Sequence, residues 1–83
     1  MSKKSKYIIF EMRGGLEVPM VFSPLIQHRE ITVVGGKPIS AGFCSLDEHE
    51  PYYDSVYGES ISLKLKSRKE DADILNKYLE YDC

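Results

Sequence analysis

The sequence predicts a small α+β domain in which about five mostly antiparallel strands pack against one C-terminal amphipathic helix. Three features lead to this fold class: short runs rich in β-branched and aromatic residues, Gly-Gly pairs beside such runs, and a helical repeat of apolar residues near the C-terminus. With 83 residues, the chain is predicted to form one domain, 1–83.

A first hairpin is predicted from residues 6–22. Residues 6–13 read Lys-Tyr-Ile-Ile-Phe-Glu-Met-Arg, and Gly14-Gly15 separates them from a second strand-like run. Glycines suit the positive φ angles of tight hairpin turns. Pro19 has no N–H to donate to a neighbouring strand, so the second strand is predicted to lie at a sheet edge. Residues 1–5 are expected to fray.

A second hairpin of the same kind is predicted over residues 31–46, with Gly35-Gly36 as its turn. Before it, Ser23-Pro24 matches a helix N-cap with proline at the first helical position. Residues 25–29 leave room only for a short helix, with His28 and Arg29 near its end and expected to be solvated.

The next two segments are predicted to be a long loop and a strand. Residues 47–57 contain Pro51 and have no hydrophobic period, which is typical of a loop. Residues 58–66 alternate, because Ile61, Leu63 and Leu65 fall on one side and polar residues on the other. Such alternation indicates a strand with one face on a core and one in water.

The C-terminal helix is predicted over residues 68–81. Ser67 and Glu70 have the spacing of a capping box, in which each side chain accepts a backbone N–H of the other residue. The apolar stripe that follows comprises Ala72, Leu75, Tyr78 and Leu79, widened by Ile74 and Tyr81. We expect this stripe to pack on the apolar face of the sheet.

Charge and hydropathy limit the classes of function. The formal net charge is −2, whereas a general nucleic-acid binder needs a basic surface to neutralise phosphates. No stretch approaches the ~18 consecutive apolar residues of a membrane span, and no signal peptide is recognisable. We therefore expect a cytoplasmic protein without membrane contact. Because a domain of this size buries a limited core, a homodimer or higher oligomer is a further expectation.

No metal site, cofactor or disulfide is predicted. The zinc-ligand types are His28, Cys44, His49 and Cys83, and they lack the tight Cys and His spacing of zinc sites. Cys44 and His49, joined by Asp47 or Glu48, are the nearest approach to such a site. A buried structural cysteine and an exposed histidine are the favoured interpretation, and the terminal Cys83 is too poorly held for a structural disulfide.

No catalytic residue is assigned either. Cys44 or Ser45 as nucleophile, with a histidine as base, is the enzymatic alternative, but a thiol in a core strand is inert. The Gly35-Gly36-Lys37 sequence lacks the earlier glycine and the following Ser or Thr of a phosphate-binding loop. We interpret it as a turn.

The most distinctive segment for recognition is 47–57, which combines tyrosines with carboxylates. Tyrosine offers a large rigid contact area and a hydroxyl group, and carboxylates attract a basic partner. The predicted partner-binding residues are Asp47, Glu48, Glu50, Tyr52, Tyr53, Asp54 and Tyr57. The alternative is that Tyr53 and Tyr57 only cover the edge of the core while the acidic residues keep the loop soluble.

Two stretches carry a resemblance to small bacteriophage-encoded accessory proteins of unassigned function. They are Ile-Ser-Ala-Gly-Phe-Cys at 39–44 and Tyr-Gly-Glu-Ser-Ile-Ser-Leu-Lys-Leu-Lys-Ser-Arg-Lys-Glu-Asp at 57–71. The resemblance implies a short protein made in an infected bacterium, which acts by blocking a host protein or by sequestering a nucleotide signal of host defence. It transfers no site residue.

Three functional hypotheses follow. The first is a non-enzymatic binding module, for example an inhibitor of a host protein, that acts through residues 47–57. The second is a homo-oligomer that holds a small nucleotide-like ligand, with Arg13, Arg29 or Arg68 for its phosphate. The third, less favoured, is a small enzyme built on Cys44 or the histidines.

Overall fold

A computed structural model describes residues 3–46 and 52–81 and confirms the α+β class. Strands β1 (Lys3–Met12), β2 (Glu17–Phe22), β3 (Gly36–Leu46) and β4 (Tyr53–Tyr57) form an antiparallel sheet in the order β2-β1-β3-β4. The other elements are a 3₁₀ turn η1 (His28–Glu30), a small hairpin of β5 (Glu59–Ser60) and β6 (Leu65–Lys66), and helix α1 (Asp71–Tyr81). No helix in these described ranges is long and apolar enough to cross a membrane.

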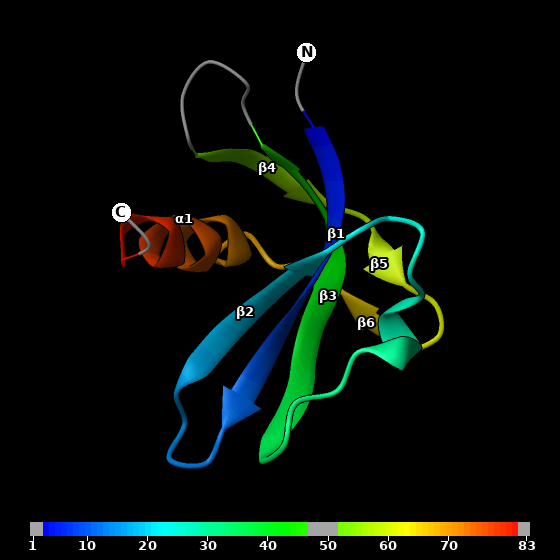
Figure 1. The fold of residues 1–83 in the computed structure, drawn as a ribbon, viewed down its shortest axis with the longest axis vertical. Coiled ribbons are helices and arrows are strands. Elements are labelled where there is room, and N and C mark those ends of the chain that lie inside the picture. Colours follow the sequence, from blue (N-terminus) through cyan, green and yellow to red (C-terminus); the bar gives the residue numbers. More distant parts are fainter. Residues whose placement is uncertain (1–2, 47–51, 82–83) are drawn as a thin grey trace.

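The sheet is covered on both faces (Figure 1), and β1 supplies two buried residues to each. Tyr7 and Ile9 pack with Leu75 of α1 on one face. Ile8 and Phe10 pack on the other face, which is covered by β5, β6 and the segment that contains η1. Residues 7–10 are therefore a continuous apolar run, as expected for a strand buried on both sides.

The first hairpin forms as predicted. Gly14 and Gly15 connect β1 to β2 with φ angles of 93° and 90°, which residues with a Cβ rarely adopt. Pro19 lies in β2, which is an edge strand of the sheet. At the other end of the hairpin, β1 begins at Lys3, inside the segment expected to fray, and pairs there with β3.

The prediction of a second hairpin is wrong for its first strand. Residues 31–34 form no strand, because their predicted partner, β3, is already paired on its two edges by β1 and β4. Ile31 and Val33 pack instead on the face opposite α1. The predicted short helix is also reduced: the Ser23 hydroxyl accepts the Leu25 N–H at 3.2 Å in a turn, and only η1 follows.

Residues 58–66 are a short hairpin rather than the predicted strand. The Ser60 hydroxyl accepts the N–H of Leu63 at 3.3 Å, and Lys64 has a φ of 58°, so the chain reverses between β5 and β6. Leu63 and Leu65 still pack on the sheet, whereas Ile61 is 84% exposed at the turn. The long predicted loop is shorter than 47–57, because residues 53–57 pair with β3 as β4.

Helix α1 begins at Asp71, three residues after the predicted start at Arg68. Asp71 closes the turn that leads into the helix, because its carboxylate accepts the Arg68 backbone N–H at 3.0 Å and its own N–H donates to the Arg68 carbonyl oxygen at 3.0 Å. Ser67, the predicted cap, donates its hydroxyl to the carbonyl of Gly58 at 2.9 Å instead. The expected packing of the apolar stripe on the sheet is observed at Ile74 and Leu75.

A polar network centred on the buried Asp71 joins the start of α1 to the sheet. The Tyr7 hydroxyl donates to Asp71 Oδ2 at 2.6 Å, and Arg68 Nε donates to Asp71 Oδ1 at 2.9 Å. The same guanidinium reaches Glu17 of β2, with Nη2 at 2.6 Å from Oε1. Asp71 is fully buried and acts as a common acceptor, so the network fixes α1 relative to β1 and β2.

Candidate functional site

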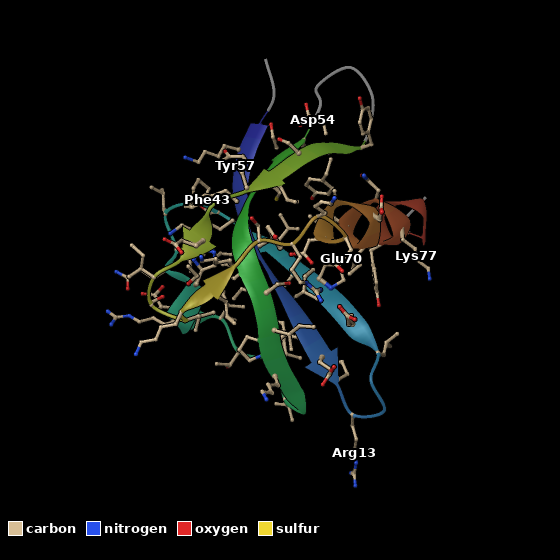
Figure 2. All side chains as sticks on the ribbon, turned by 180° about the vertical axis from the view of Figure 1, so that it is seen from behind. Arg13, Phe43, Asp54, Tyr57, Glu70 and Lys77 are labelled. Carbon is tan, nitrogen blue, oxygen red and sulfur yellow. The ribbon has the colours of Figure 1, made fainter. Side chains whose placement is uncertain are left out.

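A row of large side chains crosses the sheet on the face opposite α1. Phe22 of β2, Lys6 of β1, Phe43 of β3 and Tyr57 of β4 occupy directly opposite positions in neighbouring strands. Directly opposite residues in antiparallel strands project from the same face. The Phe43 and Tyr57 rings stack, with centroids 5.9 Å apart and planes inclined by 19° (Figure 2). We call Phe22, Phe43 and Tyr57 the aromatic row; Lys6 lies between Phe22 and Phe43.

His28 packs against two rings of this row and has a structural role. It is only 4% exposed, and its Nε2 lies 3.0 Å from the Gly42 carbonyl oxygen. The edges of Phe22 and Phe43 meet the imidazole in T-shaped contacts with centroid distances of 5.5 and 6.0 Å. Burial lowers the pKa of His28, which favours the neutral imidazole. The expectation that this histidine is solvated was wrong, because η1 turns it into the core.

Two lysines lie against the aromatic row. The Lys4 Nζ is 4.7 Å from the Phe43 ring centroid, and the Lys6 Nζ is 6.0 Å from it. Both distances suit a cation–π interaction, which also limits the conformations of each lysine side chain. Lys6 further donates to the Ile26 carbonyl oxygen at 2.9 Å. The basic start of the chain is thus part of the folded sheet.

Beside the aromatic row lies an open pocket of about 300 Å³. Its wall combines side chains from the sheet, from the start of η1 and from the turn between β5 and β6. They are Lys6, Gln27, His28, Phe43, Glu59, Ser60, Ile61 and Ser62. The wall therefore offers an ammonium, a carboxylate, an amide, hydroxyls and an aromatic ring.

The structure separates the tyrosines of the predicted partner-binding residues. Tyr52 and Tyr57 are 39% and 42% exposed, and Asp54 is exposed between them. Tyr53 is half-buried and packs on the core that faces α1, so it covers the core edge, and its burial raises its pKa. Asn76 of α1 binds the Tyr53 backbone, accepting its N–H at 2.5 Å and donating to its carbonyl at 3.0 Å. Asp47, Glu48 and Glu50 lie outside the described residues.

The groups considered for catalysis do not come together. Cys44 is fully buried on the face toward α1, whereas His28 lies on the opposite face. Burial raises the pKa of the Cys44 thiol to about 12, which leaves it protonated and unreactive near neutral pH. Within residues 3–46 and 52–81, no three Cys, His, Asp or Glu residues are grouped to hold a metal ion. His49 and Cys83 lie outside these ranges.

The three arginines considered for phosphate binding also lie apart. Arg68 is bound to Glu17 and Asp71 in the polar network centred on Asp71. Arg13 extends from the tip of the first hairpin, at the far end of the sheet from Phe43 (Figure 2). Arg29 is exposed on η1. The residues that do converge, Lys6 and Phe43, were not selected from the sequence, because their proximity depends on the pairing of β1 with β3.

One buried hydroxyl has no role in these contacts. Ser40 of β3 is fully buried, and its Oγ has no hydrogen-bond partner in the described part of the chain. A buried unpaired polar group costs ~1–3 kcal/mol. We therefore expect Ser40→Ala to raise the free energy of unfolding by about 1 kcal/mol in urea titrations. A loss of stability on this substitution would contradict the assignment of Ser40 as an unpaired hydroxyl.

Comparisons with protein-family models, with curated proteins and with solved structures find no match for this chain. The functional conclusion therefore depends on the geometry of the aromatic row, the pocket and β4.

Proposed function

We propose that this protein is a non-enzymatic binding module that contacts a protein partner through the outer surface of β4. The observation that carries the proposal is the exposure of Tyr52 and Tyr57 on either side of Asp54, at and beside an edge strand. Tyrosine is enriched among the residues that dominate binding energy at protein interfaces. We call Tyr52, Asp54 and Tyr57 the β4 surface.

Contacts on both faces of β4 hold part of the β4 surface in place, which favours binding. The ring of Tyr57 stacks on Phe43, and Asn76 fixes the backbone of Tyr53 on the opposite side. A bulge in the pairing of β4 with β3 changes the register between Ser55 and Tyr53. Side chains that are already ordered lose less conformational entropy on association, so more of the contact energy appears as affinity.

Charge indicates the chemistry of the partner. Asp54 is exposed and forms no ion pair with any described residue, and the adjoining sequence adds Asp47, Glu48 and Glu50. A surface of this composition attracts a partner with basic residues around an apolar centre. We propose a host protein as that partner, in line with the resemblance to bacteriophage accessory proteins.

The test is affinity capture from bacterial lysate, followed by measurement of the dissociation constant with the purified partner. Tyr57→Ala and Asp54→Lys are each expected to weaken binding by at least about tenfold, since an interface residue that dominates affinity contributes ~2 kcal/mol or more. Leu16→Ala is the matched control, because Leu16 is an exposed apolar residue in the distant first hairpin. A partner that binds both β4 variants as tightly as the unmodified protein would disprove the assignment.

A further inference from the structure

The pocket beside the aromatic row has the size of a site for one small molecule. Ligand pockets usually enclose ~300–1,000 Å³, and this pocket of about 300 Å³ lies at the lower end of that range. It is formed where the turn between β5 and β6 and the residues before η1 cover the sheet beside β1 and β3. Its wall includes none of the β4 surface residues, although Tyr57 stacks on Phe43, so Asp54→Lys tests the protein-binding surface separately from the pocket.

Lys6 provides a binding group for an anion. An ammonium has three N–H donors, and among the described residues Lys6 uses one, to the Ile26 carbonyl oxygen. The remaining donors are available at the pocket wall. The hydroxyl of Ser62 belongs to the same wall, and it is exposed. A phosphate group can accept from both an ammonium and a hydroxyl, and its charge matches that of Lys6.

Phe43 provides an apolar wall for a flat ring. Tyr57 stacks on one side of the Phe43 ring, and His28 makes a T-shaped contact with it. These contacts fix the orientation of the ring without a ligand. The exposed Lys4 ammonium lies 4.7 Å from the ring centroid, so a base would stack on Phe43 in place of Lys4. Nucleobases pack favourably on aromatic side chains, with a contribution of ~1–3 kcal/mol per base.

Glu59 provides an acceptor for hydrogen-bond donors of the base. Lys66 lies opposite Glu59 in the β5–β6 pair, yet Glu59 forms no ion pair with a described residue. An ionised carboxylate accepts two parallel hydrogen bonds. Guanine presents two adjacent N–H donors on its Watson–Crick edge and so matches this geometry better than the other bases.

We propose that this pocket binds a guanine nucleotide, with the phosphate at Lys6 and Ser62, the base against Phe43, and the donors of the base at Glu59. The site lies within a single copy of the chain and needs none of the arginines considered from the sequence. It adds a small-molecule site to the protein-binding function and does not depend on it.

Titration calorimetry of the full-length protein with guanosine monophosphate tests the proposal. We expect saturable binding, at least tenfold tighter than that of guanosine, inorganic phosphate or uridine monophosphate. Lys6→Gln and Phe43→Leu are each expected to weaken binding at least tenfold. Lys37→Gln is the matched control, because Lys37 is an exposed lysine at the opposite end of β3 from Phe43 and should leave affinity unchanged.

A measurement on the unmodified protein removes any dependence on how the variants fold. On addition of guanosine monophosphate, amide resonances of Phe43 and of residues 59–62 should shift, and those of residues 71–78 in α1 should not. Absence of binding at millimolar nucleotide, or unchanged affinity in Lys6→Gln, would overturn the proposal. Equally tight binding of inorganic phosphate would show an anion site without base recognition and would overturn it too.

Discussion

Replacing Asp71 with alanine is expected to lower the free energy of unfolding by about 2–4 kcal/mol, because it leaves buried donors without their acceptor. The Asp71 carboxylate accepts from the Tyr7 hydroxyl at 2.6 Å, from the Arg68 N–H at 3.0 Å and from Arg68 Nε at 2.9 Å. Tyr7 is fully buried, so its hydroxyl would have no water to replace the carboxylate. For a domain of this size, the melting temperature should fall by ~4–8 °C per kcal/mol.

The control for this prediction is Asp73→Ala. Asp73 lies in the same first turn of α1 but is exposed, so its loss should change stability by only about 0.5 kcal/mol. Tyr7→Phe removes the hydroxyl alone, and a double-mutant cycle with Asp71→Ala isolates the energy of their hydrogen bond. A cost below ~1 kcal/mol for Asp71→Ala would show that the network does not fix α1 to the sheet.

Gly42→Ala is expected to destabilise the protein by about 2–3 kcal/mol, through steric overlap with backbone atoms. A Cβ at Gly42 would lie 2.6 Å from the carbonyl oxygen of Tyr57 and 3.2 Å from Cβ of Ser67. These neighbours belong to β4 and to the segment that leads into α1, so they can yield only by displacing those elements from β3. Urea denaturation measures the loss, and the altered position of Tyr57 should also weaken partner binding.

Gly35→Ala is the control, because it measures the cost of replacing a glycine of positive φ where no steric overlap occurs. Gly35 has a φ of 80° in a turn, and a Cβ there would meet no atom within 4 Å. Its substitution should cost only about 1 kcal/mol of conformational strain. If Gly42→Ala costs no more than Gly35→Ala, the close approach of β3, β4 and Ser67 is not what requires glycine at position 42.

The parts of the fold that could be predicted from the sequence are those set by neighbouring residues. The first hairpin follows from two strand-like runs separated by Gly14-Gly15, and the edge position of β2 follows from the missing N–H of Pro19. The existence of α1 follows from its apolar stripe. Its start was misplaced because the Ser67 hydroxyl binds Gly58, a residue outside the local helix-capping pattern.

The errors arise where distant segments compete for the same sheet edge. Residues 31–34 have strand-like composition, but β1 and β4 occupy the two edges of β3, the strand with which they were predicted to pair. The alternation of apolar and polar residues over 58–66 suits both the predicted single strand and the observed short hairpin. Leu63 and Leu65 pack on the sheet in both arrangements.

The candidate pocket could not be predicted for the same reason. Lys6 and Phe43 are adjacent only in the register of β1 with β3, and sequence patterns do not determine register between strands so far apart. For the predicted partner-binding residues, the sequence left open whether the tyrosines are displayed for recognition or only cover the edge of the core. It could not distinguish Tyr57, which is exposed, from Tyr53, which Asn76 and the core hold inward.

The position of β1 between two apolar clusters has a consequence for how the molecule unfolds. Tyr7 and Ile9 serve one cluster, and Ile8 and Phe10 serve the other, so the loss of either covering layer exposes one side of the same strand. Each cluster takes two of its fully buried residues from β1. The two layers should therefore melt together in a single cooperative transition, although they lie on opposite sides of the sheet.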